Sequence, residues 1–287
     1  MSFRSANPTQ SRVRTARTAA LGLAAAALVA LAVAPRSGAQ VADIPAKTSP
    51  LARLLFVRAG TFEVRQDTTR LGTEFYRIYL SPGRDTLLVS GHVIYELPRA
   101  KGQVRYEKHA LRLLRALDNF LAVYQTHEDI GGQDRAMALA THDTSASIYH
   151  EANEEGQGVT IAVPPGRVYT LDASMYEQVE FMARDFLETD LPTRIVHALI
   201  PARDTVIAIR LTKGPMEKVG KIQARRVDLY DDLTLIQTWL DADGNLLRLE
   251  APAAKVHVVR LPPGEDEAQA LSDAAGPAFT PKTPTKR

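Results

Sequence analysis

The fold is decided by KIQARRVDLYDDLTLIQTWLDADGNLLRLEAPAAKVHVVR, residues 221–260. β-branched and aromatic residues are frequent in it, and apolar side chains recur with a period of two, which predicts four half-buried strands. Polar turns are predicted at Asp231-Asp232 and at 241–245, where Asp-Gly lies between two apolar runs. Ala251-Pro252 ends the third strand, because proline has no N–H to donate to a sheet. The stretch also contains the only Trp of the chain, Trp239.

The turn at 241–245 also resembles a calcium-binding loop, since Asp241 and Asp243 alternate with other residues. An EF-hand loop places Gly at its sixth position and Glu at its twelfth. Counted from Asp241, Gly244 is fourth and Glu250 is tenth. The spacing therefore favours a hairpin turn over a metal loop.

The chain before this stretch repeats the pattern of short strands and polar turns. The predicted strands cover residues 61–65, 71–80, 85–97, 120–126, 136–140, 146–151, 157–163, 193–200 and 204–211. A bulge is predicted in the third of these strands, at Gly91. Residues 51–58 fit either a short helix or a strand.

Residues 104–117 also fit two interpretations. Val104 and Tyr106 alternate as in a strand, whereas four later residues have the spacing of a helix face. That helix face would consist of Ala110, Leu113, Leu114 and Leu117. We favour a strand, because Asp118-Asn119 then forms the same kind of polar turn as the turns of the 221–260 stretch.

A helix is predicted at Met175–Leu187. Ser174 is the predicted N-cap, and Glu177 three residues later completes a capping box. Pro192 marks the end of the helical region. The apolar face consists of Met175, Val179, Met182, Ala183 and Phe186.

At least ten strands and one helix are therefore predicted, and nearly all their connections are short. Short connections favour an antiparallel sheet, and a sheet of this size should curl. The predicted fold is mainly β, in the α+β class. It is a large curved antiparallel sheet, or half-barrel, with one central amphipathic helix on its concave face.

Residues 1–39 have the pattern of a secretory signal peptide. Arginines between Arg4 and Arg17 form a basic region, an apolar run covers Ala19–Ala34, and Ser37-Gly38-Ala39 is a small-residue cleavage site. Because the apolar run is short for a transmembrane helix, cleavage after Ala39 is favoured over an uncleaved membrane anchor. We therefore expect an exported protein, periplasmic or extracellular and soluble after cleavage.

Removal of the signal peptide changes the charge balance of the chain. Residues 1–39 contain five Arg and no acidic residue, so the remainder has 30 basic and 33 acidic side chains and a net charge of −3. A nucleic-acid-binding protein usually needs a basic surface, so no nucleic-acid partner is expected. The chain has no Cys, which excludes disulfides, thiolate metal sites, a cysteine nucleophile and a lipid-modified N-terminal Cys.

The remaining chain is long enough for one domain. Residues 40–50 are interpreted as a linker and residues 51–261 as a single β-rich domain. Residues 262–287 are rich in Pro, Ala and charged residues and contain one aromatic residue, Phe279. Such a tail cannot bury enough apolar surface to offset the entropy of ordering it, so we expect it to be disordered.

Three features of the sequence carry a resemblance to known proteins. These are Gly72–Tyr76 (GTEFY), the helix after a Pro-rich turn, and Trp239–Arg248 (WLDADGNLLR). In residues 58–261 the chain resembles uncharacterised secreted bacterial β-rich proteins of the domain-of-unknown-function kind, whose architecture is similar to the LolA-like half-barrels that carry lipidated proteins or lipids across the periplasm. The resemblance implies a fold, and it assigns no ligand site to particular residues.

Common catalytic and cofactor motifs are absent from the sequence. None of the seven His lies in an H-x-x-x-H or H-E-x-x-H spacing. The chain has no G-x-S-x-G elbow, no Walker loop and no dinucleotide fingerprint. We therefore expect no metal and no cofactor, and a non-catalytic role is favoured over a hydrolase with an unrecognised active site.

The apolar face of the predicted helix has two interpretations. It fills the core, as is usual for an amphipathic helix, or it contacts a lipid, since Met adapts to irregular partners. As the function we predict binding of a hydrophobic ligand, a lipid or a lipidated chain, in the curved sheet. A cell-envelope interaction module that uses an open sheet edge is the alternative. The predicted ligand-lining residues are Met175, Val179, Met182, Phe186, Tyr230 and Trp239.

Overall fold

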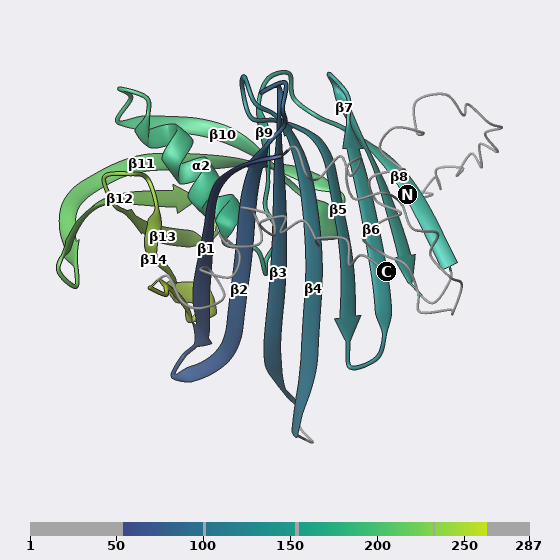
Figure 1. The fold of residues 1–287 in the computed structure, drawn as a ribbon, viewed down its shortest axis with the longest axis horizontal. Helices are drawn as coiled ribbons and strands as arrows, with labels where there is room; N and C mark the ends of the chain where they lie inside the picture. Colours follow the sequence, from purple (N-terminus) through teal and green to yellow (C-terminus); the bar gives the residue numbers. More distant parts are fainter. Residues whose placement is uncertain (1–53, 100–101, 153–154, 232, 263–287) are drawn as a thin grey trace, which may run out of the picture. The chain divides into compact units, whose positions relative to one another are not determined.

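Fifteen strands form one curved sheet, and a helix lies on its concave face (Figure 1). The computed structural model describes residues 54–99, 102–152, 155–231 and 233–262. The strands are β1 (Leu55–Gln66), β2 (Thr69–Leu80), β3 (Thr86–Arg99), β4 (Gly102–Arg115), β5 (Phe120–Ile130), β6 (Asp134–Thr141), β7 (Ser145–Ala152), β8 (Glu155–Ala162), β9 (Val168–Thr170), β10 (Thr193–Ile200), β11 (Thr205–Val219), β12 (Ile222–Tyr230), β13 (Leu235–Leu240), β14 (Leu246–Ala251) and β15 (Val256–Arg260). The helices are α2 (Glu177–Leu187) and the short 3-10 helices η3 (Pro201–Arg203) and η4 (Pro252–Ala254).

The sheet runs in the order β8 to β1 and then β15 to β9, so the first and last strands pair near its middle. The neighbouring strands are antiparallel, as predicted, except that β9 and β10 are parallel. β9 ends the strand order, yet it also contacts β5. The sheet therefore curls over its own concave face, which confirms the expected mainly β half-barrel with one helix.

The ambiguous segment 104–117 forms a strand, β4, as favoured from the sequence. Its inward positions include Lys108 and Arg112, which are almost fully buried. Because these two inward positions are polar, the apolar alternation typical of a strand is interrupted in this segment. The apolar residues that remain have a spacing that resembles a helix face. The other ambiguous segment, 51–58, enters β1 at Leu55.

The helix lies where it was predicted, but its N-terminus is capped differently. α2 begins at Glu177, and its N-cap residue Tyr176 makes no side-chain hydrogen bond to the helix. Instead, the carboxylate of Glu74 on β2 accepts hydrogen bonds from the backbone N–H groups of Tyr176 at 2.7 Å and Glu177 at 3.0 Å. The predicted capping box is therefore wrong, because the hydroxyl of Ser174 bonds to Asp172.

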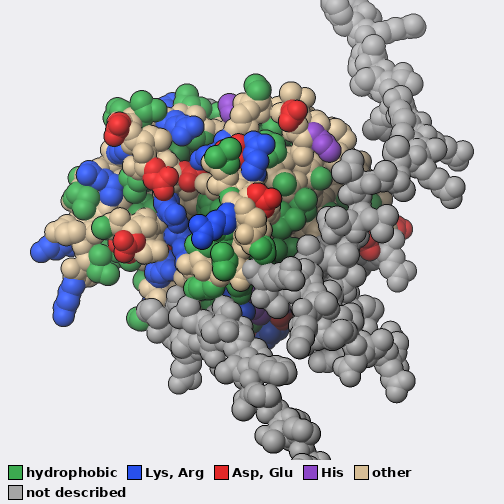
Figure 2. Space-filling view, turned by 45° about the horizontal axis from the view of Figure 1, so that its top comes forward, with side chains coloured by type: hydrophobic (Ala, Val, Ile, Leu, Met, Phe, Trp, Pro, Cys, Tyr) green, Lys and Arg blue, Asp and Glu red, His purple; other side chains and the backbone are tan. Residues whose placement is uncertain are grey.

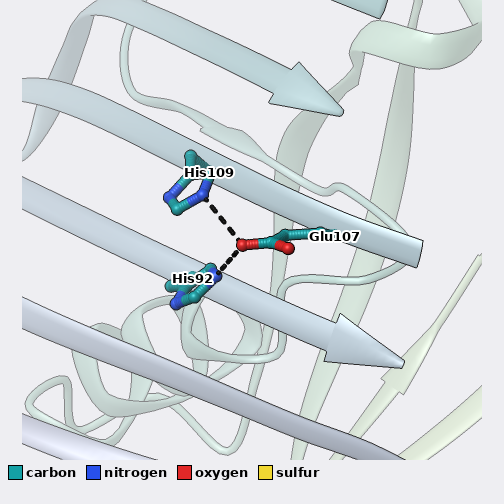
Figure 3. Close-up of side chains that lie close together, drawn as sticks. All are labelled: His92, Glu107 and His109. Atoms are coloured by element: carbon teal, nitrogen blue, oxygen red, sulfur yellow. Dashed lines mark hydrogen bonds and ion pairs between the residues drawn. The ribbon is translucent and has the colours of Figure 1, made fainter. Parts of the chain in front are cut away.

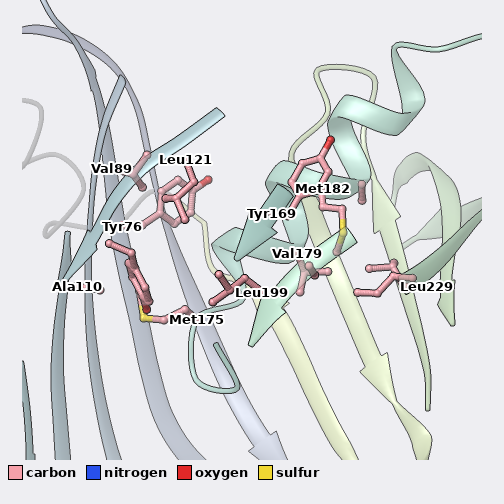
Figure 4. Close-up of a cluster of buried hydrophobic side chains, with 14 of the residues drawn as sticks. Tyr76, Val89, Ala110, Leu121, Tyr169, Met175, Val179, Met182, Leu199 and Leu229 are labelled. Atoms are coloured by element: carbon pink, nitrogen blue, oxygen red, sulfur yellow. The ribbon is translucent and has the colours of Figure 1, made fainter. Parts of the chain in front are cut away.

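The main core lies between the concave face of the sheet and α2 (Figure 4). The predicted bulge at Gly91 is absent, since the register of β3 with both β2 and β4 is continuous there. Gly91 instead leaves room for the end of the Met175 side chain. A Cβ at Gly91 would lie 2.1 Å from Met175 Cε.

The surface is mixed in character. On the face shown in Figure 2, basic and acidic side chains are both distributed among apolar ones. In the part of the chain that the structure describes, no helix is both long and apolar enough to cross a membrane. The predicted signal peptide, the linker and nearly all of the predicted tail lie outside the described residues.

Candidate functional site

The predicted ligand-lining face of the helix is filled by the core (Figure 4). Met175 and Met182 are 0% exposed, and Val179 and Phe186 are 5% and 1% exposed. They pack against the concave face of the sheet in one apolar cluster. The core interpretation is therefore the one that their burial supports.

The other two predicted residues lie on the far side of the same sheet region. Trp239 packs with Ala224 and Leu247 in a small cluster separate from the main core. Its indole N–H donates to Glu217 at 2.8 Å. Tyr230 is 39% exposed. The cavity described next is lined by none of the six predicted residues. Contact of these six residues with a ligand stays a prediction.

A cleft of about 660 Å³ lies on the concave side of the sheet, away from the filled helix face. Its residues come from β4 to β8, from the turn before α2 and from η3. The lining residues are Lys108, Thr126, Glu128, Gln133, Asp134, Arg135, Ala136, Met137, His150, Glu151, Ala152, Glu155, Gly156, Gln157, Asp172, Ala173, Pro201 and Ala202. Most of these strand residues point to the same face of the sheet as the buried core residues, because side chains alternate along a strand. The cleft is therefore formed by the inward face of the sheet.

A buried ion pair forms the inner end of this cleft. Lys108 is 2% exposed and contacts Asp172, and its ammonium lies 2.7 Å from Glu128. The hydroxyl of Tyr124 donates to Asp172 at 2.8 Å. Although burial disfavours a charged lysine, Asp172 raises the pKa of Lys108, and Lys108 in turn outweighs burial to lower the pKa of Asp172. Both groups are therefore charged at neutral pH, and a protonated lysine is not a nucleophile.

A second polar contact joins the sheet to η3 at the cleft. His150 of β7 and Asp204, which follows η3, are 2.7 Å apart. A hydrolase would need a nucleophile beside such a pair. Among the described residues, no hydroxyl is hydrogen-bonded to His150. The pair joins β7 to the residue that follows η3.

Near the helix, a buried network binds α2 to the sheet. Glu180 is 0% exposed, and its carboxylate lies 2.9 Å from Arg58 and 3.1 Å from Arg260. It also accepts hydrogen bonds from the hydroxyl of Tyr76 at 2.9 Å and from the backbone N–H of Leu246 at 3.1 Å. The helix is thus held by charged contacts as well as by apolar packing, and Glu180 satisfies groups from four strands.

Two other buried carboxyl groups near α2, those of Glu74 and Glu177, have raised pKa values. Burial, together with repulsion from Glu177, raises the pKa of Glu74 well above its usual range. Burial raises the pKa of Glu177 to about 7, although Arg112 opposes the shift. The Arg112 guanidinium is 2.9 Å from Glu177, but this contact lacks hydrogen-bond geometry. Sequence reasoning missed these residues, because single charged positions inside strands have no local signature.

One group of side chains has the composition of a metal site. On the convex face, His92, Glu107 and His109 each offer a ligand atom, and these atoms lie within 4.8 Å of one another (Figure 3). Hydrogen bonds from Arg105 and His92 lower the pKa of Glu107 to about 2. No motif in the sequence indicated this group, because its members come from two strands.

Comparison with known proteins identifies a fold. No protein-family model matches the chain, and no curated protein matches it. Among solved structures, it is similar to a beta-barrel-like protein of the domain of unknown function DUF1849 from Brucella abortus. The TM-score is 0.51 at 10% sequence identity, and the match covers 72% of this chain and 95% of that one. The likeness agrees with an uncharacterised β-rich fold, while the LolA-like assignment stays a prediction.

Proposed function

We propose that the chain is an exported, non-catalytic binding protein whose concave cleft holds an amphipathic ligand, such as a lipid or a lipidated chain. The observation that carries the proposal is the cleft of about 660 Å³. Sites for small molecules usually enclose about 300–1,000 Å³. The cleft is large enough for a head group and part of an alkyl chain.

The lining favours an amphipathic ligand over a wholly apolar one. Apolar surface comes from Met137, Ala152, Pro201 and Ala202. At inward positions of the lining, the acidic residues are Glu128, Glu155 and Asp172 and the basic residues are Lys108 and Arg135, whereas Asp134 and Glu151 alternate toward the other face. Because Lys108 is already paired, the excess charge of the cleft is negative. A cationic or neutral head group therefore suits it better than an anionic one.

The first test is native mass spectrometry of the chain purified from an exporting host, followed by solvent extraction. A reproducible mass increment that extracts as a lipid supports the proposal and names the ligand class. An unliganded mass is followed by calorimetric titration with two probes of equal chain length, dodecyltrimethylammonium and dodecyl sulfate. Preferential binding of the cationic probe is expected, and failure of both probes to bind would contradict the proposal.

A pair of variants places the ligand. Ala202 is the exposed second residue of η3 and lines the cleft, whereas Ala253 is the exposed second residue of η4 and does not. Ala202→Trp should weaken binding of the cationic probe because its indole occupies the cleft. Ala253→Trp should bind the probe as the wild type does. Equal effects of the two substitutions would place the probe elsewhere.

An open sheet edge supports a second candidate function, strand addition to a partner. β8 is a terminal strand of the sheet, and within the described residues it pairs with β7 alone. Its sequence EGQGVTIA contains one charged residue, Glu155, and no Lys or Pro. Such an edge is a template for another strand, because Lys and Pro are the usual means of blocking one.

This candidate is tested by sedimentation velocity. Thr160 on β8 is exposed and lies opposite Ser147 on β7, which is also exposed. If the β8 edge pairs with a second copy, the wild type should self-associate with increasing concentration. Thr160→Lys should abolish the association and Ser147→Lys should leave it. A wild type that stays monomeric at all concentrations would contradict pairing of the β8 edge with a second copy.

A further inference from the structure

The convex face of the sheet carries a row of histidines that the cleft does not use. The register of β3, β4 and β5 places His92 opposite His109, and His109 opposite His127. The rings of His92 and His109 stack with centroids 4.2 Å apart and planes 12° apart. Residues 17 positions apart in the sequence thus form one pair of imidazoles on neighbouring strands.

Glu107 completes a set of three donors. Its Oε1 lies 3.0 Å from His92 Nε2 and 3.3 Å from His109 Nε2, so both ring nitrogens face one oxygen (Figure 3). Two donors bound to a tetrahedral zinc ion at 2.0–2.1 Å are about 3.3–3.5 Å apart. The two distances to Glu107 Oε1 are close to this donor separation, and all three donor atoms lie within 4.8 Å of one another. Because an imidazole nitrogen coordinates in the plane of its ring, the near-parallel rings of His92 and His109 must rotate apart for both nitrogens to point at one ion.

The carboxylate of Glu107 is held in place from its other side. Arg105 Nη2 donates to Glu107 Oε2 at 2.9 Å, which leaves Oε1 toward the histidines. Hydrogen bonds of this kind orient metal ligands and increase affinity. All three donors lie on β3 and β4, which pair along most of their length. Their backbone is therefore already ordered before an ion binds.

We propose that His92, Glu107 and His109 bind one divalent first-row transition cation, such as Zn²⁺, on the convex face of the sheet. Two imidazoles and one carboxylate suit Zn²⁺, Ni²⁺ or Cu²⁺ better than Mg²⁺ or Ca²⁺, which prefer oxygen ligands. The three side chains are 34%, 30% and 58% exposed, so a fourth position is open to water. His127 faces Asp134 at 3.6 Å and is not one of the donors.

The test is calorimetric titration of the full, untagged chain with Zn²⁺ after treatment with a chelator. One Zn²⁺ per chain should bind with high affinity. Loss of a partner that merely orients a ligand reduces metal affinity about 10- to 100-fold, so His92→Ala and His109→Ala should each reduce it by at least that much. Glu107→Gln should weaken binding as well.

The control variant is His257→Ala. His257 is also exposed and lies 3.5 Å from a carboxylate, that of Glu250, but it has no second imidazole in the same group. This substitution should leave the Zn²⁺ affinity unchanged. Far-UV circular dichroism of each variant checks that the sheet is intact, which is expected because the substituted side chains lie outside the core.

Imidazole nitrogen NMR gives a second readout. On addition of Zn²⁺, the Nε2 signals of two histidines should shift to values of coordinated nitrogen, and these signals should vanish with the two Ala substitutions. Absence of Zn²⁺ binding by the wild type would overturn the proposal. So would unchanged affinity of the His92→Ala/His109→Ala double variant, since the ion would then be bound elsewhere.

Discussion

At the scale of single residues, Glu180 joins α2 to the sheet through buried charged contacts. Its carboxylate is fully buried and is shared by two guanidiniums, Arg58 and Arg260, which are 15% and 16% exposed. Removing one member of a buried ionic group leaves the others desolvated without a counter-charge. The stability of the helix–sheet contact therefore depends on this side chain more than on any exposed charge of α2.

We predict that Glu180→Gln lowers the free energy of unfolding by about 3–5 kcal/mol, because both arginines lose their buried anion. Urea unfolding followed by circular dichroism measures the change. The control is Glu188→Gln at the end of the same helix, where an exposed contact of 3.7 Å with Arg184 should be worth at most about 0.5 kcal/mol. Similar effects of the two substitutions would contradict the prediction.

Glu177 makes folding depend on pH. Burial raises its pKa to about 7 in the folded protein, above the value of about 4.3 for an unfolded glutamate. The folded state therefore binds this proton more tightly. Its contribution to stability is fully present below about pH 4 and is lost as the pH rises through about 7.

We therefore expect Glu177→Gln, which mimics the protonated form, to become more stable relative to the wild type as pH rises from about 5 to 8. The difference should reach several degrees in Tm, measured by thermal unfolding at each pH. Glu188→Gln, on the exposed part of the helix, should show no such trend. A constant difference between Glu177→Gln and wild type across this range would refute the assignment of the shift to Glu177.

At the scale of elements, the contact between α2 and the sheet depends on complementary shapes. The segment leading into α2 places Met175 against Gly91 of β3, and this side chain is fully buried. Gly91 was expected to bulge the strand, whereas it provides the space that the thioether occupies. A long, flexible side chain fills such a space well.

We predict that Met175→Ala destabilises the protein by about 2–5 kcal/mol, because it leaves a cavity beside Gly91. Gly91→Ala alone should also destabilise it, since the new Cβ would lie 2.1 Å from Met175 Cε. In the double variant the added methyl occupies part of the cavity, so the two effects should not add.

Chemical denaturation of the single and double variants completes this cycle. The control is Gly158→Ala on β8, where a new Cβ has its nearest neighbour at 3.9 Å. That substitution should be nearly neutral and should add to the effect of Met175→Ala. Simple additivity of Gly91→Ala and Met175→Ala would show that the two sites do not share one space.

At the scale of the whole molecule, β15 joins the two halves of the sheet. β1 to β8 extend in one direction and β14 to β9 in the other, and β15 pairs with both β1 and β14. Its last residue, Arg260, also reaches Glu180 on the helix. The last described strand, β15, is therefore the pairing partner of the first strand, β1.

We predict that a chain ending at Ala254, which lacks β15, does not unfold cooperatively, because β1 and β14 each lose a partner. A chain ending at Pro262 keeps every described strand and should unfold at the same temperature as the full chain. Scanning calorimetry distinguishes the outcomes. A cooperative transition of the shorter chain would show that the two halves fold without β15.

The sequence by itself determined the helix and most of the strands and turns, although β9 and the second half of β11 were not predicted. Alternation in 221–260, the Asp-Gly turn and the amphipathic spacing of 175–187 are local patterns, and each element formed where it was predicted. The strand interpretation of 104–117 was also correct, although inward Lys108 and Arg112 obscured it. Local periodicity suffices for such predictions because it depends on residues close together in the chain.

Only the tertiary structure decided which residues share a site. The cap of α2 comes from Glu74, which is over 100 residues away in the chain. Lys108 meets Asp172 across the cleft, and His92 meets His109 through strand register. Each depends on how the sheet curls and how its strands align, and both follow from the packing of the whole domain. A pattern that is periodic along one segment contains no information about that alignment.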